Sequence, residues 1–362
     1  MKKIIVFLFI LFLLPTVIFA FEFGVGTSIN TGFGNQSDGD FAFDFSAGLW
    51  PHFFMFIGDN GEFVTSVGLS LGIFNEEFFI IPEILNTELT MRFDTSEIRA
   101  GRMGYSDPLG FIADGLFDGF QFINYSHLGH FNIGVWYTGL LYKKTANIKM
   151  TAQEQTAFYQ PVDYGDFINT YFAPRRVVAA LGWEYPSLFE FMNLNAALIA
   201  QFDVAGDYHS QYLIAKASIP LSRLRLEFGG AVELSQVEEF GLGFAGMFGI
   251  YWQIPGTFNS LLSFSGRIAG GGSDELLSPF NPITSKYYGL AFKSKFSGLS
   301  IFSLDYSARL LRSLGISAGV LYFVRNDFGT FSGYPVEPDN QGYFLGRNFM
   351  LGRFTVHFLI YS

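Results

Sequence analysis

Hydrophobic residues alternate with polar or small residues along much of the chain after residue 20. In the segment 21–33, Phe, Val and Ile occupy one parity, and Glu, Gly, Ser and Asn occupy the other. A period of two predicts a β-strand with one apolar face. The same pattern predicts further strands at 41–50, 63–73, 85–93, 131–141, 176–185, 194–202, 224–234, 240–253, 262–269, 288–296, 302–310, 316–323 and 354–361.

The polar parity of these strands is small as well as polar. In 240–253, Gly241, Gly243 and Ala245 alternate with Leu242 and Phe244. Charged residues make up 15% of the chain, against about 25% in soluble domains. In a soluble sheet, the polar face would be exposed and would carry many Lys and Glu residues. Small polar residues instead fit the interior of a barrel, and the apolar face fits contact with lipid. The sequence therefore predicts an all-β fold, a transmembrane antiparallel up-and-down β-barrel of roughly 16–18 strands.

The first 20 residues have the layout of a secretory signal. Lys2 and Lys3 precede the apolar run 4–14, and Ala20 is a small residue at a plausible cleavage point. The run is too short to cross a bilayer as a helix, which takes about 20 residues. We expect a signal peptide at 1–20 and a single transmembrane β-barrel domain at 21–362, located in a bacterial outer membrane.

The apolar strand parity predicts outer-membrane lipid as one partner, and the end of the chain predicts a second. Segment 352–362, with Phe354, Val356 and Phe358 on one parity, resembles the terminal strand that barrel-assembly machineries recognise. It departs from that pattern because Ser362 follows Tyr361, where an aromatic terminus is usual. The expected partners are thus outer-membrane lipid and the barrel-assembly machinery.

The connectors between strands are of two kinds. Tight turns are predicted at 59–61, 220–222 and 255–256, and long polar loops at 143–175, 270–285 and 326–341. Such barrels place short turns on one side of the membrane and long loops on the other. Three predicted strands separate the last two loops, which would put those loops on opposite sides. Either one strand is wrong, or one long loop lies on the short-turn side.

The segment Arg99-Ala100-Gly101-Arg102, followed by 106–119, resembles a strand-and-turn region of alginate-export-type and related porin-like barrels. The excess of phenylalanine, 46 residues, is similar to that of spirochaetal outer-membrane proteins. The first resemblance implies a diffusion channel in which an inward Arg99 meets the solute.

Catalytic and metal-binding patterns are weak. His127 and His130 flank a predicted turn, but no third ligand lies at a suitable spacing. The glycine run 270–272 lacks the Gly-Lys-Ser/Thr ending of a phosphate-binding loop. We expect no enzymatic activity, no metal, no cofactor and no nucleic-acid partner.

Charges on the inward parity give the functional hypothesis. The candidate pore-lining residues are Asp44, Glu88, Arg92, Arg99, Glu184, Lys216, Arg225, Glu227, Glu233, Arg267, Lys293 and Arg309. Opposed acids and bases across a wide lumen set the size limit and ion preference of a pore. We predict a porin-like channel for passive diffusion of small hydrophilic solutes or ions. The net charge of -10 favours a weak cation preference, whereas the inward bases favour anions.

Two alternatives stay open. The barrel could be a scaffold whose surface loops bind a ligand or a host, and the aromatic segment 143–175 is long enough for that role. The same segment could equally fold inward and constrict a channel. The barrel could also transport a hydrophobic solute, although the predicted first strand leaves no room for an N-terminal hatch.

Overall fold

A computed structural model describes residues 21–35, 41–74, 77–189, 191–206, 208–236, 240–256, 258–271, 278–286, 288, 295–311, 314–326 and 348–358. The predicted signal peptide lies outside these residues. By its internal contacts the chain divides into two compact units, Met1–Met103 and Gly104–Ser362.

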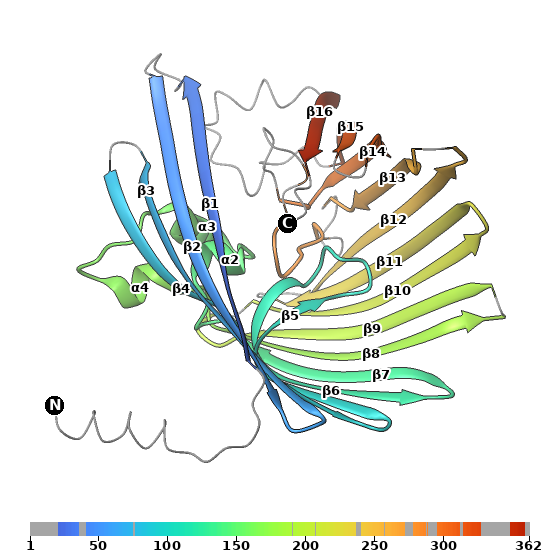
Figure 1. The fold of residues 1–362 in the computed structure, drawn as a ribbon, viewed down its shortest axis with the longest axis horizontal. Coiled ribbons are helices and arrows are strands. Elements are labelled where there is room, and N and C mark those ends of the chain that lie inside the picture. Colours follow the sequence, from blue (N-terminus) through green and yellow to red (C-terminus); the bar gives the residue numbers. More distant parts are fainter. Residues whose placement is uncertain are drawn as a thin grey trace. The chain divides into compact units, whose positions relative to one another are not determined.

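The described residues form sixteen strands and three short helices (Figure 1). The helices are α2 (Lys143–Ala146), α3 (Ala152–Tyr159) and α4 (Phe167–Tyr171). None of the described helices is long and apolar enough to cross a membrane. The strands are β1 (Phe21–Asn35), β2 (Phe41–Ile57), β3 (Gly61–Phe74), β4 (Glu77–Phe93), β5 (Ser96–Ser106), β6 (Asp114–Ser126), β7 (Gly129–Tyr137), β8 (Arg176–Leu188), β9 (Met192–Asp203), β10 (His209–Leu221), β11 (Leu224–Gln236), β12 (Phe240–Ile254), β13 (Ser260–Ala269), β14 (Leu299–Arg309), β15 (Leu314–Arg325) and β16 (Asn348–Phe358).

In the first unit, β1 to β5 pair antiparallel in chain order. The pairing of β3 with β4 shifts register between Ser66 and Val67, because Ser66 pairs with Asn86 and Val67 with Ile84. The additional residue, Leu85, is a bulge that moves the later residues of β4 to the opposite parity. Beyond it, Glu88 and Thr90 are buried while Leu89 is exposed. The predicted polar parity of this strand is therefore confirmed.

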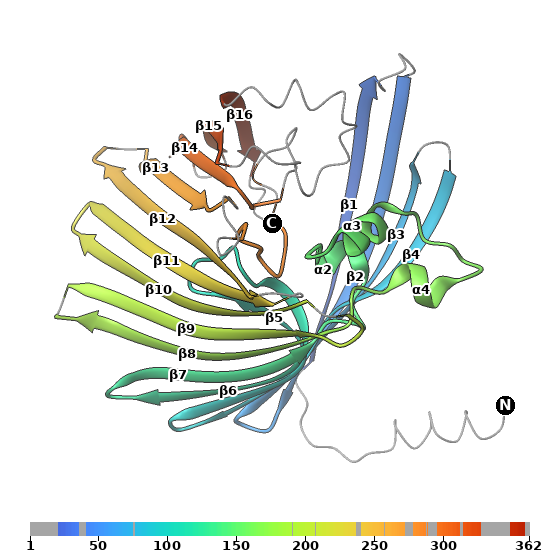
Figure 2. The ribbon, with the colours of Figure 1, turned by 180° about the vertical axis from the view of Figure 1, so that it is seen from behind.

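In the second unit, β6 to β16 continue as an up-and-down antiparallel sheet, and Figure 2 shows β6 to β13 following one another across it. One face of this sheet is apolar and exposed. Six residues from six neighbouring strands form a paired row on this face, each between 46% and 64% exposed: Ile133, Leu181, Leu198, Leu213, Val232 and Phe244. Such a broad apolar surface needs a covering other than water.

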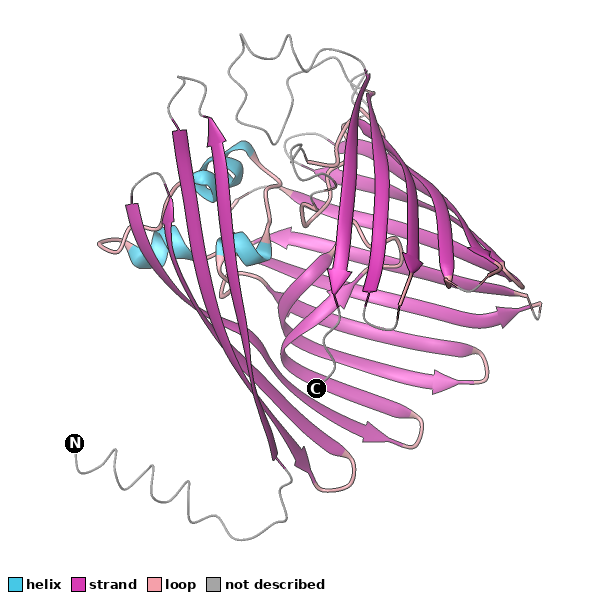
Figure 3. Ribbon diagram, turned by 45° about the horizontal axis from the view of Figure 1, so that its top comes forward, coloured by secondary structure: helices cyan, strands magenta, loops and turns pink. Residues whose placement is uncertain are grey.

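The opposite face of the same strands is covered by the protein itself. Tyr212, Ile214, Ala231 and Glu233 are buried there by connectors that fold back onto the sheet. Figure 3 shows that the helices lie in connectors and that the strands make up most of the drawn structure. The two faces predicted from the alternation are therefore present, with opposite exposures.

Most predicted strands are confirmed, including those at 41–50, 176–185 and 240–253. The strand at 288–296 is wrong at its described positions, because Tyr288, Lys295 and Phe296 lie outside any strand. Among the described strands, only β14 and β15 then separate the connector after β13 from the chain after β15. Both connectors leave the sheet at the same end, which removes the conflict between the predicted long loops.

Candidate functional site

Three connectors of the second unit meet on the covered face of the sheet. We call their meeting point the connector junction and define it as residues 109–112, 147–150 and 280–285. The N–H of Thr284 donates to the carbonyl of Ile112 at 3.0 Å, and the N–H of Ser285 donates to the carbonyl of Asn147 at 2.8 Å. The side-chain amide of Asn281 donates to the carbonyl of Met150 at 3.0 Å. These contacts join segments that lie more than a hundred residues apart.

The junction has an apolar centre. Phe111, Phe280 and Phe296 are almost fully buried, and the rings of Phe111 and Phe296 meet edge to face with centroids 4.9 Å apart. Asp107 shapes the first connector, since its carboxylate accepts hydrogen bonds from the N–H groups of residues 109, 110, 112 and 113. Burial raises the pKa of Asp107, although these donors favour its ionised form. The connector is thus folded around one buried carboxyl group.

The junction is attached to the sheet through β10, β11 and β12. Glu233 accepts hydrogen bonds from the N–H of Asn281 at 2.6 Å and from the hydroxyl of Tyr208 at 3.0 Å. The hydroxyl of Tyr212 donates to the carbonyl of Asn281 at 2.5 Å. A Cβ atom at Gly243 would lie only 3.1 Å from the Cα of Phe280. The small residue lets the connector approach the strand closely.

The β7–β8 connector, residues 138–175, contains all three helices. Helix α3 begins with a capping box, in which Thr151 Oγ1 accepts from the N–H of Glu154 and the Glu154 carboxylate accepts from the N–H of Thr151. Lys143 Nζ donates to the carbonyls of Ala157 and Gln160 at the other end of the helix. A cation at a helix C-terminus is stabilised by the unpaired carbonyls there. Both ends of α3 are therefore fixed by charged side chains.

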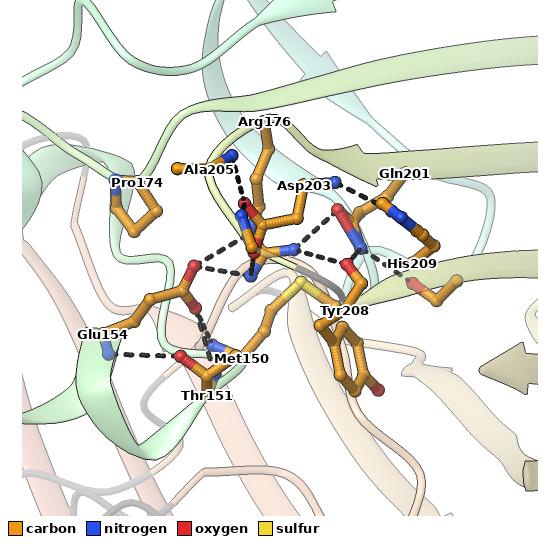
Figure 4. Close-up of polar contacts among 12 residues, drawn as sticks. Met150, Thr151, Glu154, Pro174, Arg176, Gln201, Asp203, Ala205, Tyr208 and His209 are labelled. Carbon is orange, nitrogen blue, oxygen red and sulfur yellow. Dashed lines mark hydrogen bonds and ion pairs between the residues drawn. The ribbon is translucent and has the colours of Figure 1, made fainter. Parts of the chain in front are cut away.

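Arg176, the first residue of β8, holds this connector against the sheet (Figure 4). Its side chain is fully buried. Nε and Nη2 donate to Glu154 Oε1 at 2.9 and 2.5 Å, and Nη1 donates to Gln201 Oε1 at 2.6 Å. Nη1 also donates to the carbonyl of Tyr208 at 3.2 Å, and Nη2 lies 3.1 Å from Asp203 Oδ2. All the nitrogens of the guanidinium are thus used.

Four lysines lie around α3 and the junction, namely Lys143, Lys144, Lys149 and Lys295. Burial, together with the smaller effects of the charges of Lys295 and Lys144, lowers the pKa of Lys149 to about 7. Burial likewise lowers the pKa of Lys295 to about 8 and that of Lys144 to about 8. The ammonium of Lys295 donates to the carbonyl of Lys149 at 2.9 Å, and that of Lys149 lies 4.4 Å from the centre of the Phe158 ring. The connectors therefore hold Lys143, Lys149 and Lys295 in poorly hydrated positions, whereas Lys144 is exposed.

A cavity of about 740 Å³ lies between the β7–β8 connector and the sheet. Ile148, Phe158 and Phe172 form part of its apolar lining. Lys143 and Asp203 contribute charged groups to it. Among the described residues, no group of three or more metal-ligating side chains could hold a metal ion.

Solved structures with this arrangement of strands are outer-membrane proteins. OpdL from Pseudomonas aeruginosa shares 11% sequence identity with the chain over 87% of this chain and 84% of OpdL, with a TM-score of 0.54. OpdQ from the same organism shares 10% identity over 94% of both chains, with a TM-score of 0.53. The chain has the fold of outer-membrane porins.

An anion-selective porin from Comamonas acidovorans is also similar, with 13% identity over 86% of this chain and 91% of that porin and a TM-score of 0.45. No protein-family model and no curated protein sequence matches the chain. The predicted fold class is confirmed: an all-β, antiparallel, up-and-down porin fold, whose sixteen described strands lie within the predicted range.

In the first unit of the porin fold, three of the predicted pore-lining residues form a ladder of charges. Arg92 Nη2 lies 2.6 Å from Glu62, and its Nε lies 3.1 Å from Glu97. Arg99 Nε lies 2.5 Å from Glu88 and 3.9 Å from Glu97. Acids and bases therefore alternate along the polar face of β3, β4 and β5.

In the second unit, Glu227 is paired with Lys216 at 3.3 Å and with Arg225 at 3.2 Å. Arg267 lies over the ring of Tyr288 at 5.1 Å. Glu233 belongs to the connector junction. The remaining candidates are not brought together in this way: Glu184 and Arg309 are exposed near strand ends, the side chain of Asp44 is not described, and Lys293 lies outside the described residues.

The sequence interpretation missed the residues that attach the β7–β8 connector, namely Arg176, Glu154 and Asp203. Two signals pointed to them. Thr151 and Glu154 have the spacing of a capping box, which places a carboxylate at the start of a helix. Arg176 has the parity of Val178 and Ala180, both of which are buried. A charge on a buried parity needs a partner, and the acid of the capping box supplies it.

Proposed function

We propose that the chain is a porin-like channel of a bacterial outer membrane, through which small hydrophilic solutes or ions diffuse passively. The observation that carries the proposal is the division of the sheet into two faces. The exposed row from Ile133 to Phe244 suits lipid, whereas the opposite face carries charged side chains and folded connectors. Only a membrane protein that encloses a polar interior has a use for both faces.

The proposal includes the route to the membrane. Residues 1–20 direct secretion, residues 21–362 form one barrel domain, and the barrel-assembly machinery inserts it among outer-membrane lipids. The resemblance of 99–102 and 106–119 to alginate-export-type barrels remains a finer hypothesis, as does the spirochaetal resemblance. In the first of these, Arg99 meets the solute, and its ion pair with Glu88 supports a place on the polar face.

The charge ladder and the β7–β8 connector have distinct roles in this channel. The charge ladder of Glu62, Glu88, Arg92, Glu97 and Arg99 provides a polar wall of mixed sign. The β7–β8 connector narrows the path from the covered face. The fold of the similar proteins supports a channel and not an enzyme.

Ion preference follows from two opposed sets of charges. The acidic excess of the chain favours cations at the mouths, while Lys143, Lys149 and Lys295 favour anions near the junction. Burial lowers the pKa of all three lysines, and that of Lys149 falls to about 7, so the charge of Lys149 is partly lost near neutral pH. We propose that a weak cation preference remains.

Swelling of liposomes that contain the refolded mature protein tests the proposal. Neutral sugars of increasing size should enter at decreasing rates, because diffusion through a narrowed channel discriminates by size. Protein-free liposomes and heat-denatured protein are the controls. Swelling rates equal to those of protein-free liposomes for every sugar would reject the channel.

The loop-scaffold alternative has one supporting feature. Tyr164 and Ile168 of the β7–β8 connector are 56% and 67% exposed, which leaves an apolar patch near α4. The buried ion pair between Glu154 and Arg176 favours the other use of this connector, as a constriction. A protein that fails the swelling test and still assembles in lipid would favour the scaffold.

A further inference from the structure

The connector junction holds the β7–β8 connector at residues 147–150, and a buried cluster of charges holds it to the sheet from α3 onward. Tyr142 and Phe172 form an isolated bridge near its two ends, and the N–H of Ala173 donates to the carbonyl of Leu141 at 2.9 Å. These contacts close the base of the connector but do not place its helices. The placement of α3 against β8 and β9 depends on side chains.

Glu154 connects the helix to the sheet with its two oxygens. Oε2 accepts from the N–H groups of Met150 and Thr151 at 2.8 and 3.0 Å, and so stabilises the start of α3. Oε1 accepts both the Nε and the Nη2 donors of Arg176. A displacement of α3 must therefore break charge-assisted hydrogen bonds, which are among the strongest in proteins.

Arg176 cannot leave this arrangement at low cost. Its side chain has no exposed surface, and its other donors bind Gln201 and the carbonyl of Tyr208. Asp203 lies 3.1 Å away, and its other oxygen accepts from the N–H groups of Ala205 and Gly206. The β9–β10 turn thus fixes Asp203, and through it Arg176. The guanidinium is held by the sheet and presents two donors to the connector.

We propose that Arg176 and Glu154 form a latch that sets the position of the β7–β8 connector and so the width of the channel. Arg176 is a positioning residue, since it acts through the connector. The inference rests on the proposed channel function. It assigns the size limit of that channel to one ion pair. The latch joins α3 to the sheet, and α3 and the sheet both line the cavity beside it.

Single-channel recording of Arg176→Gln and Glu154→Gln tests the latch. Each variant should raise the mean conductance by about twofold and add rapid current fluctuations, because the released connector narrows the path less and moves. The double variant should show no further increase, because both substitutions remove the same contact. Arg223→Gln, which removes one positive charge from an exposed turn after β10, should keep the conductance of the original protein.

Trypsin provides a second readout that does not require conduction. Lys149 is buried in the latched connector, so the original protein should resist cleavage after this residue, and both latch variants should be cut there. Glu154→Gln leaves Arg176 with Gln201 and Asp203, so this variant should assemble even where Arg176→Gln does not.

The outcomes separate the two proposals. An original protein that does not conduct, with latch variants that are cut by trypsin, would reject the channel and retain the latch. Variants with unchanged conductance, unchanged fluctuations and unchanged cleavage would overturn the latch while leaving the channel intact.

Discussion

Gly243 shows which properties of a single residue can be predicted from the sequence. Its inward parity and small size were evident from the alternation in 240–253, and Gly243 is buried on the covered face. Its partner was not evident, because Phe280 reaches it from a connector and a Cβ at Gly243 would crowd that segment's backbone. Parity is a local property of a strand, whereas packing against a distant connector is not.

For charged residues too, contacts between neighbouring strands were predictable and contacts with a distant connector were not. Glu88, Arg92 and Arg99 were predicted on the polar face, and their ion pairs join adjacent strands whose register follows from short turns. Arg176 and Glu154 were not predicted, because 21 residues of irregular chain and short helices lie between them. The missing information was the path of the connector.

Lys149 should make the docking of the β7–β8 connector sensitive to pH. Its pKa in the folded protein is about 7, against an ordinary value of 10.5. At a pH between these two pKa values, the released connector binds more protons than the docked connector. Docking is therefore strongest at high pH and weakens as the pH falls through this range, with no further loss from this group below it. Lys144 and Lys295, which also have lowered pKa values, act in the same direction.

Hydrogen–deuterium exchange measures this effect in the refolded protein. After correction for intrinsic exchange, amides of 144–160 should be less protected at about pH 7 than at about pH 10. Lys149→Met retains the length of the side chain and should reduce the difference. Equal protection at both pH values would contradict the burial of these lysines.

Among the elements, strands at 114–126 and 209–221 were missed although neighbouring strands were predicted. In β6, the apolar residues Leu116, Phe117, Phe120 and Phe122 do not keep a single parity. In β10, the covered parity carries Tyr212 and Ile214, so both faces are apolar and the alternation is lost. Both strands face buried connectors, which explains why a pattern based on one polar face failed.

Replacing the β7–β8 connector tests its role as an element. Tyr142 and Phe172 are paired, so a glycine-serine loop of about four residues can join them without straining β7 or β8. We expect this variant to admit larger sugars in the liposome assay and to swell faster with small ones, because the constriction is gone. The matched control replaces 143–171 by a flexible segment of the same length as the original, which removes the ordered helices without shortening the connector. An unchanged size limit in the short variant would show that the connector does not narrow the path.

For the whole molecule, the apolar face makes the strongest prediction about stability. Leu213, at the centre of the exposed row, is 64% exposed. Leu213→Arg should lower the free energy of unfolding in lipid by about 2–4 kcal/mol, the cost of a lipid-facing Arg near the midplane. Ser218→Arg lies on the same strand but on the opposite parity, where it pairs in register with Glu227, and should cost much less. Urea titrations in vesicles measure both, and equal costs would contradict the assignment of the faces.

Single-channel recording of the refolded mature protein in a planar bilayer tests most directly whether the molecule conducts. We expect discrete conductance steps and, in a salt gradient, a weak cation preference. That preference should fade as the Debye length shortens from about 10 Å at 0.1 M salt to about 3 Å at 1 M. An anion preference that persists at high salt would assign selectivity to the basic residues of the connectors and the inward face. A protein that inserts into the bilayer and gives no conductance steps would contradict the channel itself.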